Sequence, residues 1–200
     1  MPDKKPMPEK FKNKYRIQSS RLQNYDYAQN GMYFVTICTK NREEFFGEII
    51  DGKMILNEIG KIAENCLQEI PQHFPHANAS EFVVMPNHVH VVIEINWNNI
   101  QQCVETQNFA SLQCLTDFAS LPCPQNKFGS QSKNLASIIR GFKIGVKKYA
   151  TINDLNFTWQ PRFYDHVIRN DESLNKIREY IQTNPEMWER DRNNIENVWI

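Results

Sequence analysis

The sequence lacks three features that would each indicate a familiar class of protein. Its five cysteines form an odd set without a C-x-x-C pair, which argues against a cysteine zinc site and against a disulfide framework. No apolar run reaches the roughly 18 residues of a membrane span, and no apolar stretch follows the basic start, as it would in a signal peptide. We therefore expect free thiols, no membrane partner and a cytoplasmic location.

The sequence also has no net charge, with 23 basic and 23 acidic residues, but these charges are unevenly distributed. Residues 1–23 hold seven Lys or Arg against two acids, and residues 118–153 hold six basic residues and no acid. Phosphate contacts need such local basic segments, whatever the global balance. A solvated basic tail would also explain residues 1–16, so composition alone leaves nucleic-acid binding as one of two interpretations.

The chain length and its 40% hydrophobic content suffice for one sizeable core, so we expect a single domain with extensions. The Lys- and Pro-rich residues 1–20 predict a basic flexible arm. The domain itself is expected over residues 21–190, followed by a C-terminal tail over residues 191–200. An Asn-, Gln- and Ser-rich stretch near residues 96–134 is predicted to be a polar insertion in a mobile loop.

Two histidines separated by one residue stand in a β-branched run that ends at Ile95. Side chains alternate across a strand, so His88 and His90 project from one face, about 7 Å apart along the strand. Such imidazoles can share a metal ion, but His-x-His also occurs on the solvated face of ordinary strands. Pro86 and Asn87 precede the pair and predict either a tight turn between two antiparallel strands or a bulge in one strand.

Hydrophobic periodicity and turn signals predict the other elements. These are a strand over residues 32–39, a hairpin with strands 45–50 and 53–56 around Asp51-Gly52, a helix from Asn57 that Pro71 ends, a helix over residues 135–150, a loop from Trp159 into a short strand before Asn170, and a helix from Asn170 or Asp171 to Asn184-Pro185. The order is compatible with an antiparallel sheet that packs against amphipathic helices.

Cationic side chains gather on one face of the predicted helix over residues 135–150. Lys133, Arg140, Lys143 and Lys147 share this face, and no acid stands nearby for pairing one turn away. We therefore predict phosphate contacts from this helix, although solvation alone explains many such stripes. Arg162 stands beside aromatic residues and is predicted either to stack on bases or to lie in an edge strand against the core.

The last predicted helix buries a stripe of leucine and isoleucine and places two polar residues on its flank. Tyr180 and Asn184 lie one helical turn apart there. Spacing alone favours a core tyrosine with a hydrated hydroxyl over a catalytic one.

Ordered motifs over about residues 20–190 closely resemble the REP-associated tyrosine transposases, within the single-tyrosine transposases of the HUH nuclease superfamily. The motifs are Arg21-Leu22 with Tyr25-Asp26-Tyr27, Tyr33 to Arg42, Val84-Met85-Pro86-Asn87-His88-Val89-His90, Ser137-Ile138-Ile139-Arg140-Gly141-Phe142-Lys143, Trp159-Gln160-Pro161-Arg162-Phe163-Tyr164-Asp165-His166 and Ile177-Arg178-Glu179-Tyr180-Ile181-Gln182-Thr183-Asn184-Pro185. The resemblance implies an α+β single domain with a central antiparallel β-sheet flanked by helices, the ferredoxin-like HUH nuclease fold.

The resemblance also implies roles for individual residues. His88 and His90 would ligate Mg²⁺ or Mn²⁺, with Asn184 at the place of a third ligand, and Tyr180 would be the nucleophile. A phenol with an ordinary pKa near 10 is a poor nucleophile at neutral pH, so the site must stabilise the phenolate or deprotonate it during attack. Tyr149 and Tyr164 are the next candidates if Tyr180 is not the nucleophile.

The activity that the resemblance implies is nicking and joining of hairpin-bearing single-stranded DNA through a 5′-phosphotyrosine. The candidate DNA contacts are Arg21, Lys133, Arg140, Lys143, Lys147, Trp159 and Arg162. One alternative is a catalytically inactive protein of the same fold that only binds hairpin DNA. Another is a structural metal-binding protein, which would not explain the basic segments. Whether the protein is a monomer or a homodimer stays open.

Overall fold

The computed structural model describes residues 21–22, 24–98, 133–191 and 193–194. The predicted basic arm, most of the predicted insertion and most of the predicted tail therefore lie outside the described residues. Trp97 and Asn134, near the two ends of the predicted insertion, both belong to the folded domain. Among the described residues, none of the helices combines the length and apolar content that crossing a bilayer requires.

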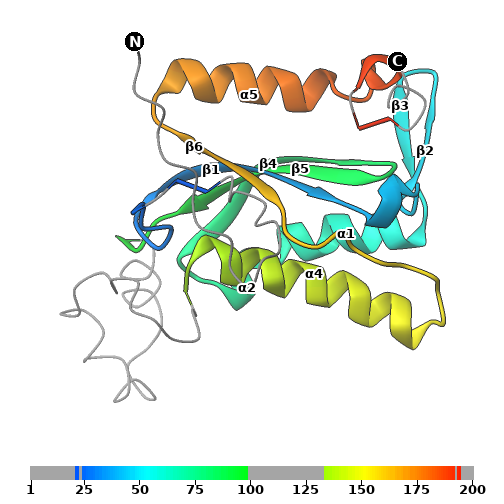
Figure 1. Cartoon of the computed structure of the whole chain (residues 1–200), viewed down its shortest axis with the longest axis horizontal. Helices are drawn as coiled ribbons and strands as arrows, with labels where there is room; N and C mark the ends of the chain where they lie inside the picture. The colour runs from blue at the N-terminus through cyan, green and yellow to red at the C-terminus, as the bar shows by residue number, and fades with distance from the viewer. Residues whose placement is uncertain (1–20, 23, 99–132, 192, 195–200) are drawn as a thin grey trace, which may run out of the picture.

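A four-stranded antiparallel sheet in the order β4-β5-β1-β6 forms the centre of the molecule (Figure 1). Its strands are β1 (Gly31–Cys38), β4 (Ala77–Met85), β5 (His88–Ile95) and β6 (Tyr164–Ile168). The two central strands, β1 and β5, consist mainly of β-branched and aromatic residues, and most of their side chains are buried. The structure thus confirms the predicted α+β fold with a central antiparallel sheet.

The segment that carries the two histidines is a hairpin. β4 and β5 pair from Ala77 opposite Ile95 to Met85 opposite His88, and Pro86-Asn87 forms the tight turn between them. The tight turn is therefore the correct alternative of the two that the sequence left open. The hairpin also contains a register shift, which lies between Ala79 and Glu81, far from the turn.

Helices cover both faces of the sheet (Figure 1). One face carries α1 (Glu58–Gln68), α2 (Ile70–His73) and α4 (Leu135–Ile152), and the other face carries α5 (Asp171–Thr183). The main core lies between the sheet, α1 and α4. A smaller cluster lies under α5, where Phe34 and Val92 of the sheet meet Leu174 and Ile181. His88 and His90 share the strand face of Val92 and therefore point toward α5.

Asparagine side chains begin three of these helices. Asn57, Asn134 and Asn170 each accept a hydrogen bond from the backbone N–H three residues further on, at the starts of α1, α4 and α5.

The prediction that Pro71 ends the first helix is wrong in its detail. That helix ends at Gln68, and Pro71 lies in the first turn of α2, where a missing N–H breaks no helical hydrogen bond.

The predicted hairpin around Asp51-Gly52 forms a separate two-stranded sheet of β2 (Gly47–Ile50) and β3 (Lys53–Leu56). Asp51 and Gly52 have positive φ values of 50° and 71°, as a two-residue hairpin turn requires. A Cβ atom on Gly52 would lie 3.6 Å from Cα of Glu186. The tip of this hairpin therefore packs against the segment that follows α5.

His76 is a buried histidine immediately before β4, and the sequence analysis did not single it out. Only 4% of its surface is exposed, and its ring stacks on Trp97 with centroids 4.2 Å apart and planes at 7°. Burial lowers the pKa of His76 from 6.5 to about 4. The unfolded chain therefore takes up this proton at a higher pH than the folded chain, so stability falls as the pH drops through that window.

We predict that lowering the pH from about 7 to about 4 removes about 3 kcal/mol of unfolding free energy through His76, from the linkage between its two pKa values. His76→Phe keeps a ring against Trp97 and should have a flatter dependence of stability on pH. Urea unfolding of both proteins across this range measures the difference. The other titrating groups contribute equally to the pH dependence of both proteins, so any difference between them comes from His76. The same dependence of unfolding free energy on pH in both proteins would contradict the prediction.

Candidate active site

His88 and His90 bring their Nε2 atoms to 3.0 Å from each other on the α5 side of the sheet. Both residues are almost completely buried, with 0% and 1% of their surface exposed. Their other ring nitrogens are also held, because Asn87 Oδ1 lies 2.9 Å from His88 Nδ1 and Thr36 Oγ1 lies 2.9 Å from His90 Nδ1. Hydrogen bonds of this kind orient histidines that bind metal ions.

Asp191 adds a buried carboxylate to the pair. Its Oδ2 lies 3.9 Å from His88 Nε2, and one ligand atom from each of the three residues lies within 4.8 Å of the others. Two imidazoles and a carboxylate suit a divalent metal ion. Sequence reasoning missed Asp191 and placed it in the tail, because a lone acid beyond the last helix has no spacing relation to β5.

Tyr180 and Asn184 lie on α5 one turn apart, as the helical spacing predicts. The Tyr180 hydroxyl lies 3.2 Å from His90 Nε2, and the residue is 40% exposed. Asn184 is buried at the C-cap of α5, and its Oδ1 has no hydrogen-bond partner among the described residues. A buried amide oxygen in this state is a suitable further ligand for a hard cation, although its role as a ligand stays a prediction.

Aromatic rings hold the two imidazoles from the sides. Phe34 stacks on His90 at 5.3 Å between centroids and meets Tyr180 edge-on at 6.1 Å. Trp188, in the short 3₁₀ helix η3 (Trp188–Arg190), stacks on His88 at 6.0 Å. These contacts limit the rotation of both imidazole rings, so the site can hold a cation and present a partly exposed phenol beside it.

Three comparisons with known proteins bear on this site. The chain matches no protein-family model. An uncharacterized protein of Haemophilus influenzae is 40% identical to it over 176 residues, 88% of this chain and 91% of that protein. A protein of the same organism named "Putative REP-associated tyrosine transposase" is 24% identical over 166 residues, 82% of this chain and 76% of that protein. The solved structure of a REP-associated tyrosine transposase bound to a REP hairpin has a similar fold, with a TM-score of 0.50 and 19% identity over 84% of this chain and 73% of that chain.

The chain is similar to REP-associated tyrosine transposases in both sequence and fold. This confirms the resemblance that the ordered motifs indicate. This similarity supports a transposase-like role for the chain. The roles of Tyr180 and the histidines in such an activity stay predictions.

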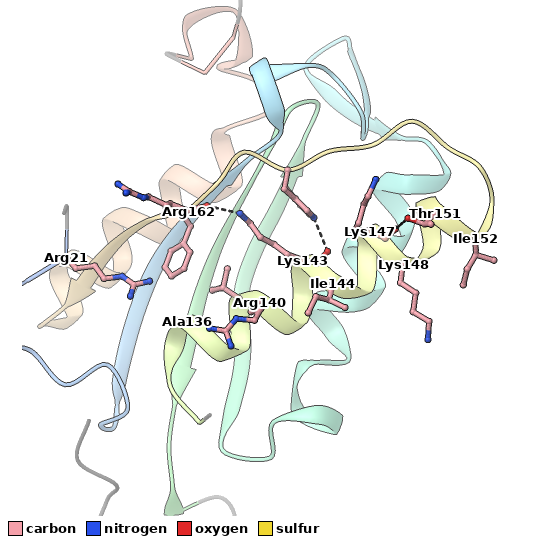
Figure 2. A pocket seen from close by; sticks show the side chains of 13 residues that line it. Arg21, Ala136, Arg140, Lys143, Ile144, Lys147, Lys148, Thr151, Ile152 and Arg162 are labelled. Carbon is pink, nitrogen blue, oxygen red and sulfur yellow. Dashed lines mark hydrogen bonds between the residues drawn. The ribbon is translucent and has the colours of Figure 1, made fainter. Parts of the chain in front are cut away.

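Most of the predicted DNA contacts gather in a groove along α4, on the other face of the sheet from α5 (Figures 1 and 2). The groove has a volume of about 800 Å³. Six of the seven predicted residues line it, namely Arg21, Arg140, Lys143, Lys147, Trp159 and Arg162. Lys133, the seventh, precedes the N-cap of α4 and is not one of the lining residues.

The groove also contains residues that the sequence analysis did not name. Ile144, Lys148 and Ile152 follow Arg140 at intervals of four residues, and Ile144 and Ile152 are exposed. Figure 2 shows Arg21 and Arg162 at one end of the groove and Lys148 and Ile152 toward the other. The four-residue spacing was the signal that could have found these residues.

Two lysines of the groove bind backbone carbonyl groups. Lys143 Nζ donates to Gln160 O at 2.8 Å and to Arg162 O at 2.7 Å, and Lys147 Nζ donates to Phe157 O at 2.6 Å. Burial lowers the pKa of Lys143 to about 8. Both lysines therefore fasten the loop before β6 to α4, and their contact with DNA stays a prediction.

Trp159, another residue of the groove, packs against aromatic residues of the core. Its ring lies 5.5 Å from Phe46, 5.5 Å from Phe142 and 4.9 Å from Phe157, measured between centroids. Its Nε1 donates a hydrogen bond to Lys143 O at 3.1 Å. Because its neighbours are core aromatics, Trp159 contributes to the packing of the loop on α4, whether or not it also meets a base.

We predict that Lys143→Met lowers the unfolding free energy by about 1–2 kcal/mol, because two backbone carbonyl groups lose their donor. Lys148→Met is the matched control on the same helix, because Lys148 is exposed and should tolerate the change within roughly 0.5 kcal/mol. Urea unfolding of the two variants measures the difference. Equal effects of the two substitutions would show that Lys143 does not fasten the loop.

Proposed function

We propose that this protein is a metal-dependent enzyme that nicks hairpin-bearing single-stranded DNA and transfers the strand through a 5′-phosphotyrosine. The observation that carries the proposal is the position of the Tyr180 hydroxyl, 3.2 Å from His90 Nε2 in the His88–His90–Asp191 group. The solved relative bound to a REP hairpin supports hairpin DNA as the substrate class. Action in the cytoplasm and the monomeric or dimeric state stay predictions.

The residues at the site fit a hard divalent ion. His88, His90 and Asp191 would hold Mg²⁺ or Mn²⁺, with the amide oxygen of Asn184 as a further ligand. When bound, the ion would supply positive charge that polarises the scissile phosphate. The hydrogen bonds of the two imidazoles with Asn87 and Thr36, and the stacked rings of Phe34 and Trp188, keep the imidazoles in place.

Tyr180 would perform the covalent step. Its Oη attacks the phosphorus, the bond between phosphorus and the 3′ oxygen breaks, and the 3′ oxygen leaves as a hydroxyl while the phenol gives up its proton. The phosphotyrosine retains the energy of the broken phosphodiester bond, so the 3′ hydroxyl of a second DNA end can reverse the step without ATP. The exposed side of Tyr180 leaves room for the phosphate to approach.

The groove along α4 would bind the DNA backbone away from the reacting phosphate. Arg140 and Arg162 are exposed in it, and cations on such a surface can contact phosphates. The groove and Tyr180 lie on opposite faces of the sheet, and β6 is the edge strand between the α4 side and α5 (Figure 1). DNA that contacts both regions would therefore pass over the β6 edge.

We predict that a single-stranded hairpin DNA incubated with this protein and Mn²⁺ gives a covalent adduct that survives a denaturing gel. Tyr180→Phe removes the nucleophilic oxygen and should abolish the adduct, whereas Tyr164→Phe and Tyr149→Phe should retain it. An adduct from Tyr180→Phe would contradict the assignment of the nucleophile. Salt-sensitive binding without an adduct from the unmodified protein would instead support the catalytically inactive hairpin-binding alternative.

A second prediction concerns the metal ligands. Asp191→Ala and Asn184→Ala should each weaken Mn²⁺ binding about tenfold or more, because each removes an oxygen ligand. Gln182→Ala, on an exposed position of α5, should leave the affinity unchanged. Electron paramagnetic resonance of free Mn²⁺ measures all three affinities. If only one of Asp191→Ala and Asn184→Ala lowers the Mn²⁺ affinity, the residue replaced in that variant is the oxygen ligand. If neither lowers the affinity, the proposed ligand set is contradicted.

A further inference from the structure

Asn87, immediately before the first histidine, is completely buried, and its amide uses both of its N–H groups. Its Nδ2 donates to Arg42 O at 3.1 Å and to Asn193 O at 2.9 Å. Its Oδ1 lies 2.9 Å from His88 Nδ1. The amide has only one orientation that satisfies these neighbours, because a flipped amide would place its oxygen against two carbonyl oxygens.

This orientation determines the tautomer of His88. Since Asn87 Oδ1 can only accept a hydrogen bond, His88 Nδ1 carries the proton and donates it. In a neutral ring, the lone pair is then on Nε2, which is the atom that faces His90 Nε2 and Asp191. Asn87 thus holds His88 in the only neutral form that can bind a cation at this place.

The other histidine is held differently. His90 Nδ1 lies 2.9 Å from the hydroxyl of Thr36, which can either donate or accept a hydrogen bond. This contact therefore does not select a tautomer for His90. Of the two imidazoles, His88 alone has its tautomer set by the group that contacts its Nδ1.

Asn87 also connects the histidine to the segment that carries Asp191. The carbonyl group of Asn193 accepts from Asn87, and the backbone N–H of Asn193 donates to Asp191 Oδ1 at 2.6 Å. Trp188, in the same segment, stacks on His88. A single amide thus contacts both His88 and the segment that brings Asp191 to it.

We infer that Asn87 is a positioning residue with two separable tasks. Its oxygen keeps the lone pair of His88 on Nε2, and its two N–H groups hold the backbone at Arg42 and at Asn193 against the site. The inference deepens the proposed function and rests on the metal site proposed there. The two tasks depend on different atoms of one side chain, so substitutions can separate them.

Asn87→Asp and Asn87→Leu provide this separation. Asn87→Asp keeps an acceptor for His88 Nδ1 but replaces the donor group by an oxygen, which repels the carbonyl groups of Arg42 and Asn193. Asn87→Leu removes both functions at a similar volume. The same two substitutions at Asn78, an exposed residue of β4, are the matched controls.

The first measurement reads the tautomer without any metal ion. Long-range ¹H–¹⁵N spectra of protein with labelled histidine should show the Nδ1–H form of His88 in the unmodified protein and in Asn87→Asp. Asn87→Leu should gain the Nε2–H form that free histidine prefers. An Nε2–H ring for His88 in the unmodified protein, or an unchanged tautomer in a folded Asn87→Leu, overturns the inference.

The second and third measurements read the metal affinity and the docked segment. Mn²⁺ affinity should fall about 10- to 100-fold in Asn87→Leu, the usual effect of losing the hydrogen-bond partner of a metal ligand. The fall should be smaller in Asn87→Asp, which keeps the acceptor for His88 Nδ1 and loses only the contacts of the donor group. Tryptic cleavage after Arg190 should accelerate in both variants, because both lose the bond to Asn193. Unchanged cleavage in both variants overturns the second task.

The outcomes distinguish this inference from the proposed function. If the unmodified protein binds no Mn²⁺, the proposed metal site fails, while the tautomer of His88 still decides the positioning role. If the unmodified protein binds Mn²⁺ and a folded Asn87→Leu binds it equally well, only the positioning role fails. If Asn87→Leu does not unfold cooperatively, the Asn87→Asp variant decides alone. Loss of the Nδ1–H tautomer of His88 in Asn87→Asp then overturns the inference. An Nδ1–H tautomer together with faster tryptic cleavage supports the inference.

Discussion

The site depends on the pairing of β5 with a strand on each of its sides. β1 and β4 pair with this strand so that His88 and His90 face α5 while Val89 and Val91 enter the main core. Because the side-chain period of a strand is two, a slip of one residue would move both histidines to the opposite face and expose buried valines. The hydrophobic core on the α4 side therefore determines where the two imidazoles point.

The position of α5 follows from a second, smaller apolar contact. Leu174 and Ile181 pack on Phe34 and Val92, and this contact sets the rotation of the helix about its axis. Tyr180 precedes Ile181, so it lies at the edge of the contact, with its hydroxyl near His90 and part of its ring exposed. The same packing that stabilises the helix thus brings a phenol to the histidines and leaves it accessible.

The two faces of the sheet differ in chemical character. The α5 face combines the buried His88–His90–Asp191 group with the phenol, whereas the α4 face combines cations with exposed isoleucines in a groove. The basic stripe of α4 is itself divided, because Lys143 and Lys147 bind backbone carbonyl groups while Arg140 is exposed. A charge stripe in a sequence therefore mixes residues that stabilise the fold with residues that are available to a partner.

The sequence by itself determined the local elements and part of the site. Strand alternation placed both histidines on one face, helical spacing placed Tyr180 and Asn184 one turn apart, and Asn57 and Asn170 marked the starts of two helices, because each of these depends on neighbours within a few residues. Only the tertiary structure decided that Asp191 completes the group and that the two lysines bind carbonyl groups. Contacts between segments that are distant in the chain follow from how the elements pack, and they leave no period or spacing in the sequence.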